Sequence, residues 1–211
     1  MLMAASAYHL GHVFLRDGQV EQATGVTMTA ARALEPGLAA ATPEHLYAWG
    51  ALHLTALIAV ARHDDRVGVR QLLGEAKATA DRLGQDRNDF WTAFGPTNVA
   101  LHEVSTAVEL GDLSEVVHKG EALDPARFQA GLVGRRAQVF IDLARGYTQQ
   151  RKDAAAVNML LEAERIAPEA IRYQVIVKEM LRELLRREHR ASTPQLRPLA
   201  ARVGILREDV S

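Results

Sequence analysis

The feature that most limits how this chain can fold is the order of small and large apolar residues over positions 137–168. The pattern consists of Leu143, Ala144, Tyr147, Ala156, Leu160, Ala163 and Pro168. Its three alanines allow two antiparallel helices to approach closely, and the larger side chains fill the space beside them. Pro168 ends the second helix because proline cannot continue the backbone hydrogen bonds. The pattern predicts a pair of packed helices joined by a turn near Arg151.

The same pattern recurs three more times along the chain. The predicted units cover residues 4–36, 43–84, 96–123 and 132–168, with turns at Gly18, Asp64, Gly111 and Arg151. The turns are separated by 46, 47 and 40 residues (64−18, 111−64 and 151−111). These distances exceed the roughly 34 residues of a standard tetratricopeptide (TPR) repeat, so the outer helices or linkers must be longer. We therefore predict an all-α, TPR-like array that forms one domain over residues 1–211.

Composition agrees with this fold and excludes several classes of protein. Hydrophobic residues make up 48% of the chain, but aromatic and β-branched residues are too few to favour sheets. The formal net charge of −1 gives no general attraction to nucleic acid, and the absence of cysteine excludes disulfides and thiolate chemistry. No apolar run reaches the roughly 18 residues of a membrane span, so we expect a cytoplasmic chain with no membrane partner.

The ends of the array are predicted to differ from its middle. An amphipathic helix over 169–188 and a short helix over 194–204 should cap the last pair. The apolar stripe of the first of these consists of Ile171, Val175, Met180, Leu181, Leu184 and Leu185. Capping oxygens are expected at Thr42, Asp112, Asp153 and Thr193. The apolar side of helix 4–16 has no capping helix of its own, which predicts self-association as a homodimer.

Three stretches carry a resemblance to a known family. They are RNDFWTAFGPTNVALHEVSTAVELGD (87–112), RRAQVFIDLARGYTQQRKDAAAVNMLLEAERIAPEAIR (135–172) and LRPLAARVG (196–204). Through these three stretches, the sequence resembles the C-terminal, TPR-like region of bacterial XRE-type helix-turn-helix transcriptional regulators. The resemblance implies a sensor or dimerisation module that couples a ligand or peptide to DNA binding. Because the chain contains no helix-turn-helix pattern, we expect no direct nucleic-acid binding by this chain alone.

Catalytic motifs are missing from the sequence. It has no HExxH, GxSxG, GxxxxGK[ST] or GxGxxG, which removes the usual support for hydrolase and nucleotide-binding functions. His9 and His12 lie three residues apart on one helix, but a metal site would need further ligands from elsewhere, so we interpret them as ordinary histidines. We expect no enzymatic activity, no cofactor and no metal.

The segment 85–98, QDRNDFWTAFGPTN, concentrates aromatic residues in a connection that would ordinarily be short and polar. Two interpretations are open. In the structural one, Trp91 and Phe94 plug the gap between the second and third helix pairs. In the functional one, the segment forms part of a ligand pocket, with Trp91 as a wall and Asn98 as a polar contact.

The first helix of each pair is expected to line a concave groove, with residues about four apart pointing inward. With Trp91, the predicted lining is Tyr8, His12, Arg16, Leu54, Ile58, Arg62, Asn98, Leu101, Ser105, Glu109, Gln138, Ile141 and Arg145. Its arginines suit a peptide or small amphipathic molecule with a carboxylate, for which Arg62 and Arg145 are the proposed clamps. The alternative is a solvated groove whose arginines pair with nearby glutamates. The sequence thus predicts a regulatory module that binds a peptide, small molecule or protein; the alternative function is a TPR scaffold for protein interactions unrelated to transcription.

Overall fold

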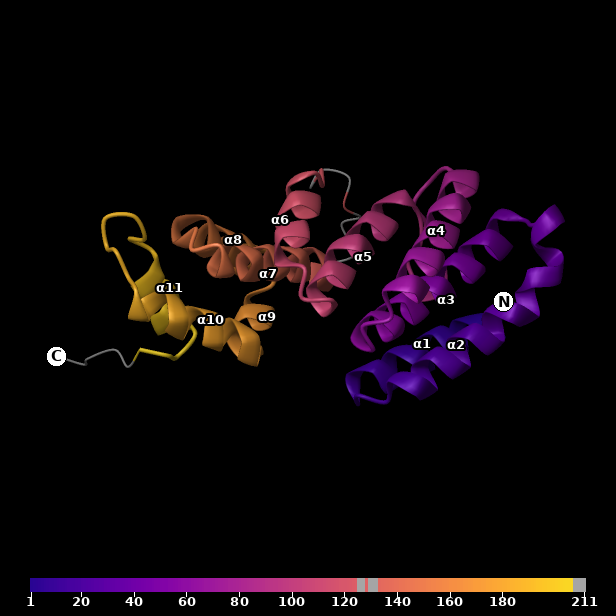
Figure 1. Ribbon diagram of the computed structural model, residues 1–211, viewed down its shortest axis with the longest axis horizontal. Helices are drawn as coiled ribbons and strands as arrows, with labels where there is room; N and C mark the ends of the chain where they lie inside the picture. Colours follow the sequence, from indigo (N-terminus) through magenta and orange to yellow (C-terminus); the bar gives the residue numbers. More distant parts are fainter. Residues whose placement is uncertain (125–127, 129–132, 207–211) are drawn as a thin grey trace. The chain divides into compact units, whose positions relative to one another are not determined.

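The computed structural model describes residues 1–124, 128 and 133–206, with residue 90 described by its backbone alone. Over these ranges the chain is helical apart from its connections, and the sole strand-like pairing among them is one bridge between Arg87 and Phe94. Figure 1 shows the helices in chain order. The predicted all-α class is confirmed.

The chain divides into two compact units, Met1–Asp112 and Leu113–Ser211, called unit 1 and unit 2. Unit 1 contains α1 (Leu2–Arg16), α2 (Val20–Leu34), α3 (Pro43–Arg62), α4 (Arg66–Leu83) and α5 (Pro96–Glu109), with the 3-10 helices η1 (Glu35–Ala40) and η2 (Asp89–Trp91). Unit 2 contains α6 (Leu113–Glu121), α7 (Val133–Gln149), α8 (Asp153–Ile166), α9 (Pro168–Tyr173), α10 (Val175–Arg186) and α11 (Leu196–Arg202). The helices fall within a few residues of the predicted repeat units; position 132, the start of the fourth unit, lies outside the described residues. That all 211 residues form one domain stays a prediction, because two compact units are compatible with one array or with two domains.

The four turns within the predicted repeats share one backbone geometry. Gly18, Asp64, Gly111 and Arg151 all have φ between 54° and 74°, the left-handed conformation that ends many helices. After each of them, the next residue donates its backbone N–H to the carbonyl five residues earlier, from Gln19 to Phe14, Asp65 to Val60, Asp112 to Ala107 and Lys152 to Tyr147. The next helix then starts two residues after the turn residue in every case. This is the Schellman arrangement, and it fixes a common register that relates the four first helices to one another.

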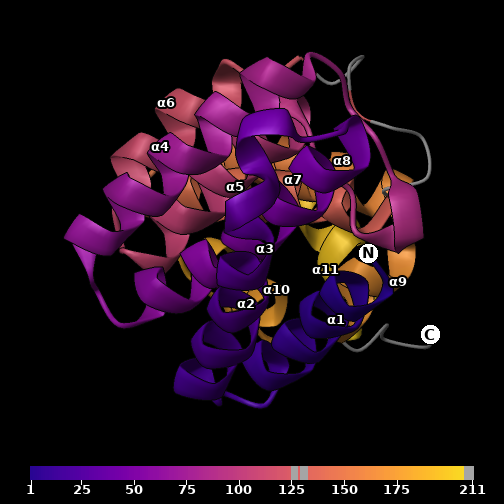
Figure 2. The same ribbon diagram turned by 90° about the vertical axis from the view of Figure 1, so that its right-hand side faces the viewer.

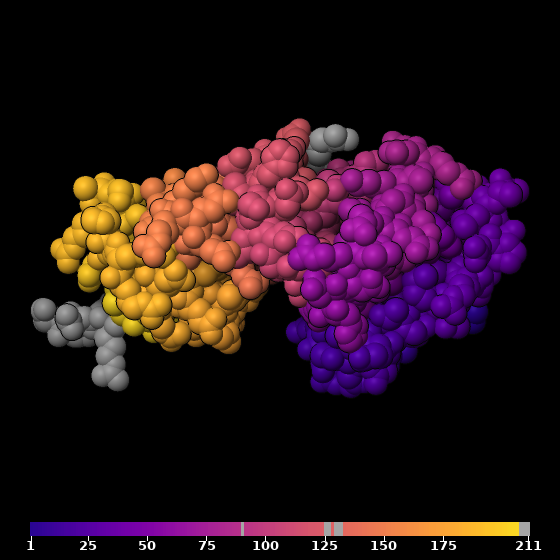
Figure 3. Space-filling model, in the orientation of Figure 1, coloured from indigo at the N-terminus to yellow at the C-terminus, as the bar shows by residue number. Residues whose placement is uncertain are grey.

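In unit 1, first helices pack on both helices of the preceding pair. Helix α3 packs against α1 and α2, and α5 packs against α3 and α4. Figures 1 and 2 show α1 and α2 side by side, with α3 packed beside them. The space-filling view shows the same first pair, in indigo, closely packed along the lower edge of unit 1 (Figure 3). Helices α2 and α3 are antiparallel: Ala23 near the start of α2 packs with Ala59 near the end of α3, and His45 at the start of α3 bonds to the carbonyl of Leu34 at the end of α2.

Unit 2 repeats this packing with a different beginning. Helix α7 packs against α6 and α8, and α9 packs against α7 and α8. Gly146 on α7 lies so close to α6 that an added Cβ would be 2.8 Å from Cγ2 of Val117. Ala144, Ala156 and Ala163 have no exposed surface, which confirms that small residues permit the close approach of α7 and α8. The boundary between the units lies in the turn after Gly111, so the third predicted pair is divided between them.

The predicted capping helix over 169–188 is wrong in one respect, because it is broken at Gln174. There the backbone is extended (φ −75°, ψ 126°), and α10 begins at the following residue. In a continuous helix Ile171 and Val175 would share a face. The break changes the register, so that Val177 is fully buried and Val175 is 68% exposed.

Of the four predicted helix caps, Thr42 is confirmed, and Asp153 and Thr193 are wrong. The carboxylate of Asp112, directly before α6, accepts hydrogen bonds from Arg66 at 2.6 and 3.4 Å. Thr42 accepts a hydrogen bond from the backbone N–H of His45 at 3.3 Å, and Asp65 caps α4 by accepting from Gly68 at 2.9 Å. Asp153 is the first residue of α8 and its carboxylate accepts hydrogen bonds from Arg187 instead. The hydroxyl of Thr193 is buried and donates back to the carbonyl of His189, while α11 starts only at Leu196.

Candidate binding site on the first helices

The predicted groove residues occupy equivalent positions in the four first helices, at fixed numbers of residues before the turn. Ten residues before the turn, the side chain is buried in all four first helices. These residues are Tyr8, Leu54, Leu101 and Ile141, with exposed fractions of 1% to 5%. They are packed between helices, so a ligand could reach them only if helices moved apart.

The positions six and two residues before the turn are accessible in all four helices. His12, Ile58, Ser105 and Arg145 are half-buried at the sixth position. Arg16, Arg62, Glu109 and Gln149 are exposed at the second. We call these eight residues the inner positions. The predicted lining is therefore open at the end of each first helix that leads into the turn and closed by packing at the other end.

Arg62 already holds a carboxylate within unit 1. Its Nε and Nη2 each donate to Oε1 of Glu109 at 3.1 Å, and its Nη1 donates to the backbone carbonyl of Leu15 at 2.6 Å. These bonds tie the ends of α1, α3 and α5 together. Arg62 thus follows the alternative prediction, in which groove arginines pair with nearby glutamates. A ligand carboxylate would have to displace Glu109.

Arg16 differs from Arg62 because it lines an open hollow. The hollow has a volume of about 440 Å³ and lies at the α1–α2 turn, lined by Val13, Phe14, Arg16, Asp17 and Gln19. Within the described part of the chain, Arg16 forms no ion pair. Further back on the helix, the ring of His12 packs edge-on against Tyr8 with 4.5 Å between centroids and approaches the hydroxyl of Thr55 at 3.4 Å.

Unit 2 carries one predicted clamp, Arg145. It is half-buried on α7, and no ion pair involves it among the residues that the structure describes. About two helical turns before Arg145 on α7, Gln138 donates to Asp142 at 2.8 Å and accepts from Gln174 at 3.2 Å. Gln138 thus links α7 to the start of α10 and has less freedom than Arg145 to meet a ligand.

The 85–98 segment follows the structural interpretation at Phe94 but not at Trp91. Phe94 is fully buried against Gly50 of α3, as the structural interpretation predicted. Trp91 is 84% exposed, so it does not plug a gap between helices. The side-chain amide of Asn98 donates to the carbonyl of Ala93 at 2.6 Å and holds the segment in place. Removal of the Trp91 side chain is consequently not expected to destabilise the fold.

The backbone of this segment is strained. Trp91 and Ala93 have φ values of 62° and 46°, a conformation that is costly for residues with a Cβ. Two backbone hydrogen bonds between Arg87 and Phe94, of 2.9 and 3.0 Å, hold the segment closed. The buried ring of Phe94 thereby anchors a loop whose tip presents Trp91 to solvent.

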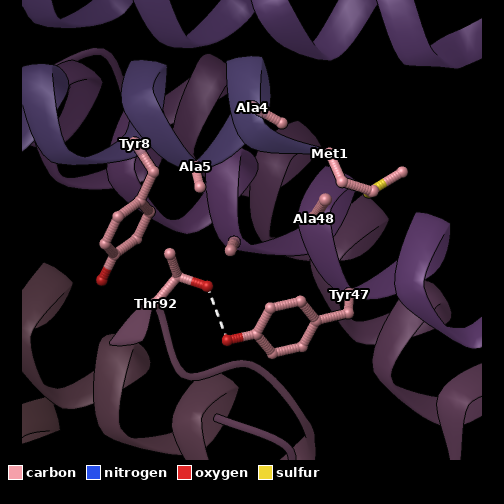
Figure 4. Close-up of a pocket in the computed structure, with 8 residues that line it drawn as sticks. Met1, Ala4, Ala5, Tyr8, Tyr47, Ala48 and Thr92 are labelled. Carbon is pink, nitrogen blue, oxygen red and sulfur yellow. Dashed lines mark hydrogen bonds between the residues drawn. The ribbon is translucent and has the colours of Figure 1, made fainter. Parts of the chain in front are cut away.

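A small cavity lies beside the loop. It has a volume of about 10 Å³, room for about one water molecule, and is lined by Met1, Ala4, Ala5, Tyr8, Tyr47, Ala48, Ala51 and Thr92. Figure 4 shows the Thr92 hydroxyl pointing at the hydroxyl of Tyr47, to which it donates at 2.6 Å. The Tyr47 hydroxyl donates in turn to the carbonyl of Asp89 at 2.5 Å. Burial raises the pKa of Tyr47, so it remains a neutral donor.

His53 is a buried polar residue that the sequence analysis did not single out. Its ring is 2% exposed, with Nδ1 2.9 Å from the carbonyl of Trp49 and Nε2 3.1 Å from Oε2 of Glu75. The indole of Trp49 stacks on it at 3.6 Å between centroids. Burial lowers the pKa of His53 despite the neighbouring carboxylate. The sequence signal that could have identified His53 is the presence of a histidine within the largely apolar run 50–61.

Among the described residues, no group of three or more histidine, aspartate and glutamate side chains is placed to hold a metal ion. No helix in the described ranges has the length and apolar character needed to cross a membrane.

No family model matches the chain, and no curated protein matches it.

Proposed function

We propose that this chain is a non-enzymatic, TPR-like module of a regulatory protein, which binds a peptide or small anionic ligand at the inner positions of the first helices within one of its units. The common Schellman turns and the stacking of first helices on preceding pairs support the TPR-like architecture. The resemblance to the TPR-like region of XRE-type regulators supports a place in transcriptional control. A helix-turn-helix reading frame directly upstream of the gene would test that link.

The observation that carries the binding function is the accessibility of the inner positions. Four first helices differ in sequence, yet all four leave the sixth and second positions before the turn accessible. Arg145 and Arg16 supply guanidinium groups there, without an ion pair in the described chain. Arginine binds a carboxylate through two parallel hydrogen bonds, which gives both affinity and orientation.

Native mass spectrometry of the chain purified from its own host tests this proposal. We expect a bound mass that persists in the wild type and in Arg70→Ala, because Arg70 is an exposed arginine on the second helix α4. Arg16→Ala should release a compound held in unit 1, and Arg145→Ala a compound held in unit 2, with a calorimetric loss of about 1.5–3 kcal/mol for the recovered compound. Retention of the compound with unchanged affinity in both variants would show that the inner positions are not its site.

The second candidate function is a scaffold that docks another protein. It is favoured by the exposed apolar residues of α1, which include Met3 and Val13 at 77% and 59% exposure. A chain that retains no small molecule but captures a protein through these residues would support the scaffold rather than the sensor.

A further inference from the structure

Helix α1 exposes a stripe at positions that the other first helices bury or half-bury. The stripe consists of Met3, Ser6, Leu10 and Val13, and the exposed fractions of its apolar members are 77%, 44% and 59%. We call it the α1 stripe. Ser6, Leu10 and Val13 lie twelve, eight and five residues before the turn at Gly18. The equivalent residues of α3 are Leu52, Ala56 and Ala59, which have no exposed surface.

In each later pair, these positions contact the second helix of the pair before it. Ala59 of α3 packs in one cluster with Ala23 of α2. Glu103 of α5 accepts a hydrogen bond from Lys77 of α4 at 2.8 Å. Leu143 of α7 lies against Gly120 of α6, whose added Cβ would be 2.4 Å from a Leu143 methyl group. The α1 stripe is thus a helix-packing face by its register.

The helix that covers such a face runs antiparallel to it, as α2 runs to α3. A second copy of α1 in this orientation meets the stripe in a self-complementary way. In the antiparallel register that places Met3 opposite Val13 of the second copy, Ser6 lies opposite Leu10. The spacing of three, four and three residues is that of a coiled-coil seam, and the small Ser6 leaves room for the larger Leu10.

We propose that the α1 stripe is a homodimer interface, in which the α1 helices of two copies pack antiparallel about a twofold axis beside residue 8. The interface is isologous, so the same residues serve both copies and the assembly closes at two. It removes from water the apolar side chains of α1 that the rest of unit 1 leaves exposed. The inference goes beyond the ligand-binding function and does not depend on it.

Sedimentation of the full chain tests the interface. We expect a dimer for the wild type and a monomer for Leu10→Glu at the same concentration, with a dissociation constant raised about tenfold or more because the carboxylate would be buried at the seam. Val67→Glu is the matched control, since Val67 is a 67% exposed apolar residue on α4 and its replacement should leave the dimer intact. Circular dichroism should show the same helix content in all three. A monomeric wild type, or a dimer that Leu10→Glu leaves intact, would overturn the proposal.

Cysteine crosslinking tests the orientation, and the chain offers a clean background because it contains no cysteine. Differently tagged Ser6→Cys and Leu10→Cys chains are mixed and oxidised. The antiparallel register predicts mixed disulfides in excess over either homodimer, because position 6 faces position 10 of the other copy. A preference for the Leu10→Cys homodimer would indicate parallel helices and contradict the register. Since neither experiment involves a ligand, failure here leaves the test at Arg145 unaffected.

Discussion

Replacement of Gly50 by alanine should show how tightly the 85–98 loop is anchored. A Cβ at position 50 would lie 2.1 Å from Cζ of Phe94 and 2.4 Å from both Cε atoms, well inside van der Waals contact. The ring cannot retreat easily, because it is fully buried, lies edge-on to Tyr47 and is held by the two backbone bonds to Arg87. Overpacking of this kind costs about 1–3 kcal/mol.

The matched control is Gly74→Ala on α4. Both glycines lie inside helices, so both replacements gain the roughly 1 kcal/mol by which alanine exceeds glycine in helix propensity. An added Cβ at Gly74 meets nothing within 4 Å. The difference in unfolding free energy between the two variants therefore isolates the contact with Phe94, and we expect Gly50→Ala to be less stable than Gly74→Ala by about 1–3 kcal/mol.

Urea denaturation followed by tryptophan fluorescence measures this difference. Trp49 and Trp91 are the two tryptophans of the chain and both lie in unit 1, so the signal reports the unit that contains the contact. In a double-mutant cycle, Phe94→Leu should lower the cost of Gly50→Ala because it removes the crowded ring atoms. Stabilities of the two glycine variants that agree within about 0.5 kcal/mol would refute the packing of Phe94 on Gly50.

Two further predictions concern the core. In unit 2, Ala156→Leu should lower the free energy of unfolding by about 1–3 kcal/mol through overpacking, because Ala156 is fully buried. Leu143→Ala should lower it by about 2–5 kcal/mol by leaving a cavity, because Leu143 is 5% exposed. If denaturation followed by circular dichroism places either variant near the wild type, the assignment of the fourth helix pair is contradicted. The pKa of His53 is lowered in the folded chain and has its usual value of about 6.5 in the unfolded chain. Below that pH the unfolded chain therefore binds more protons than the folded chain. The contribution of a neutral His53 to stability is fully present above about pH 6.5 and falls as the pH drops through that value. His53→Leu should lack this loss between about pH 7.5 and 5.5, and equal pH dependence in both proteins would show that His53 does not cause it.

The sequence by itself determined the helices and the turns between them. Gly18, Asp64, Gly111 and Arg151 were located from the order of small and apolar residues, and all four adopt the left-handed conformation that ends a helix. Local order was sufficient because a turn of this kind and the helices beside it depend on residues only a few positions apart. The same reasoning identified Ala144, Ala156 and Ala163 as sites of close helix packing.

The tertiary structure decided which faces of these helices meet each other and which remain accessible. Periodicity groups Tyr8, His12 and Arg16 on one side of a helix, but only packing buries the first, half-buries the second and leaves the third exposed. Pairing of Arg62 with Glu109 joins residues 47 positions apart, and the break at Gln174 exchanges Val177 for Val175 in the core. Amphipathic patterns record that a face is apolar; the neighbour that covers it is set by contacts distant in sequence, which a single helix does not encode.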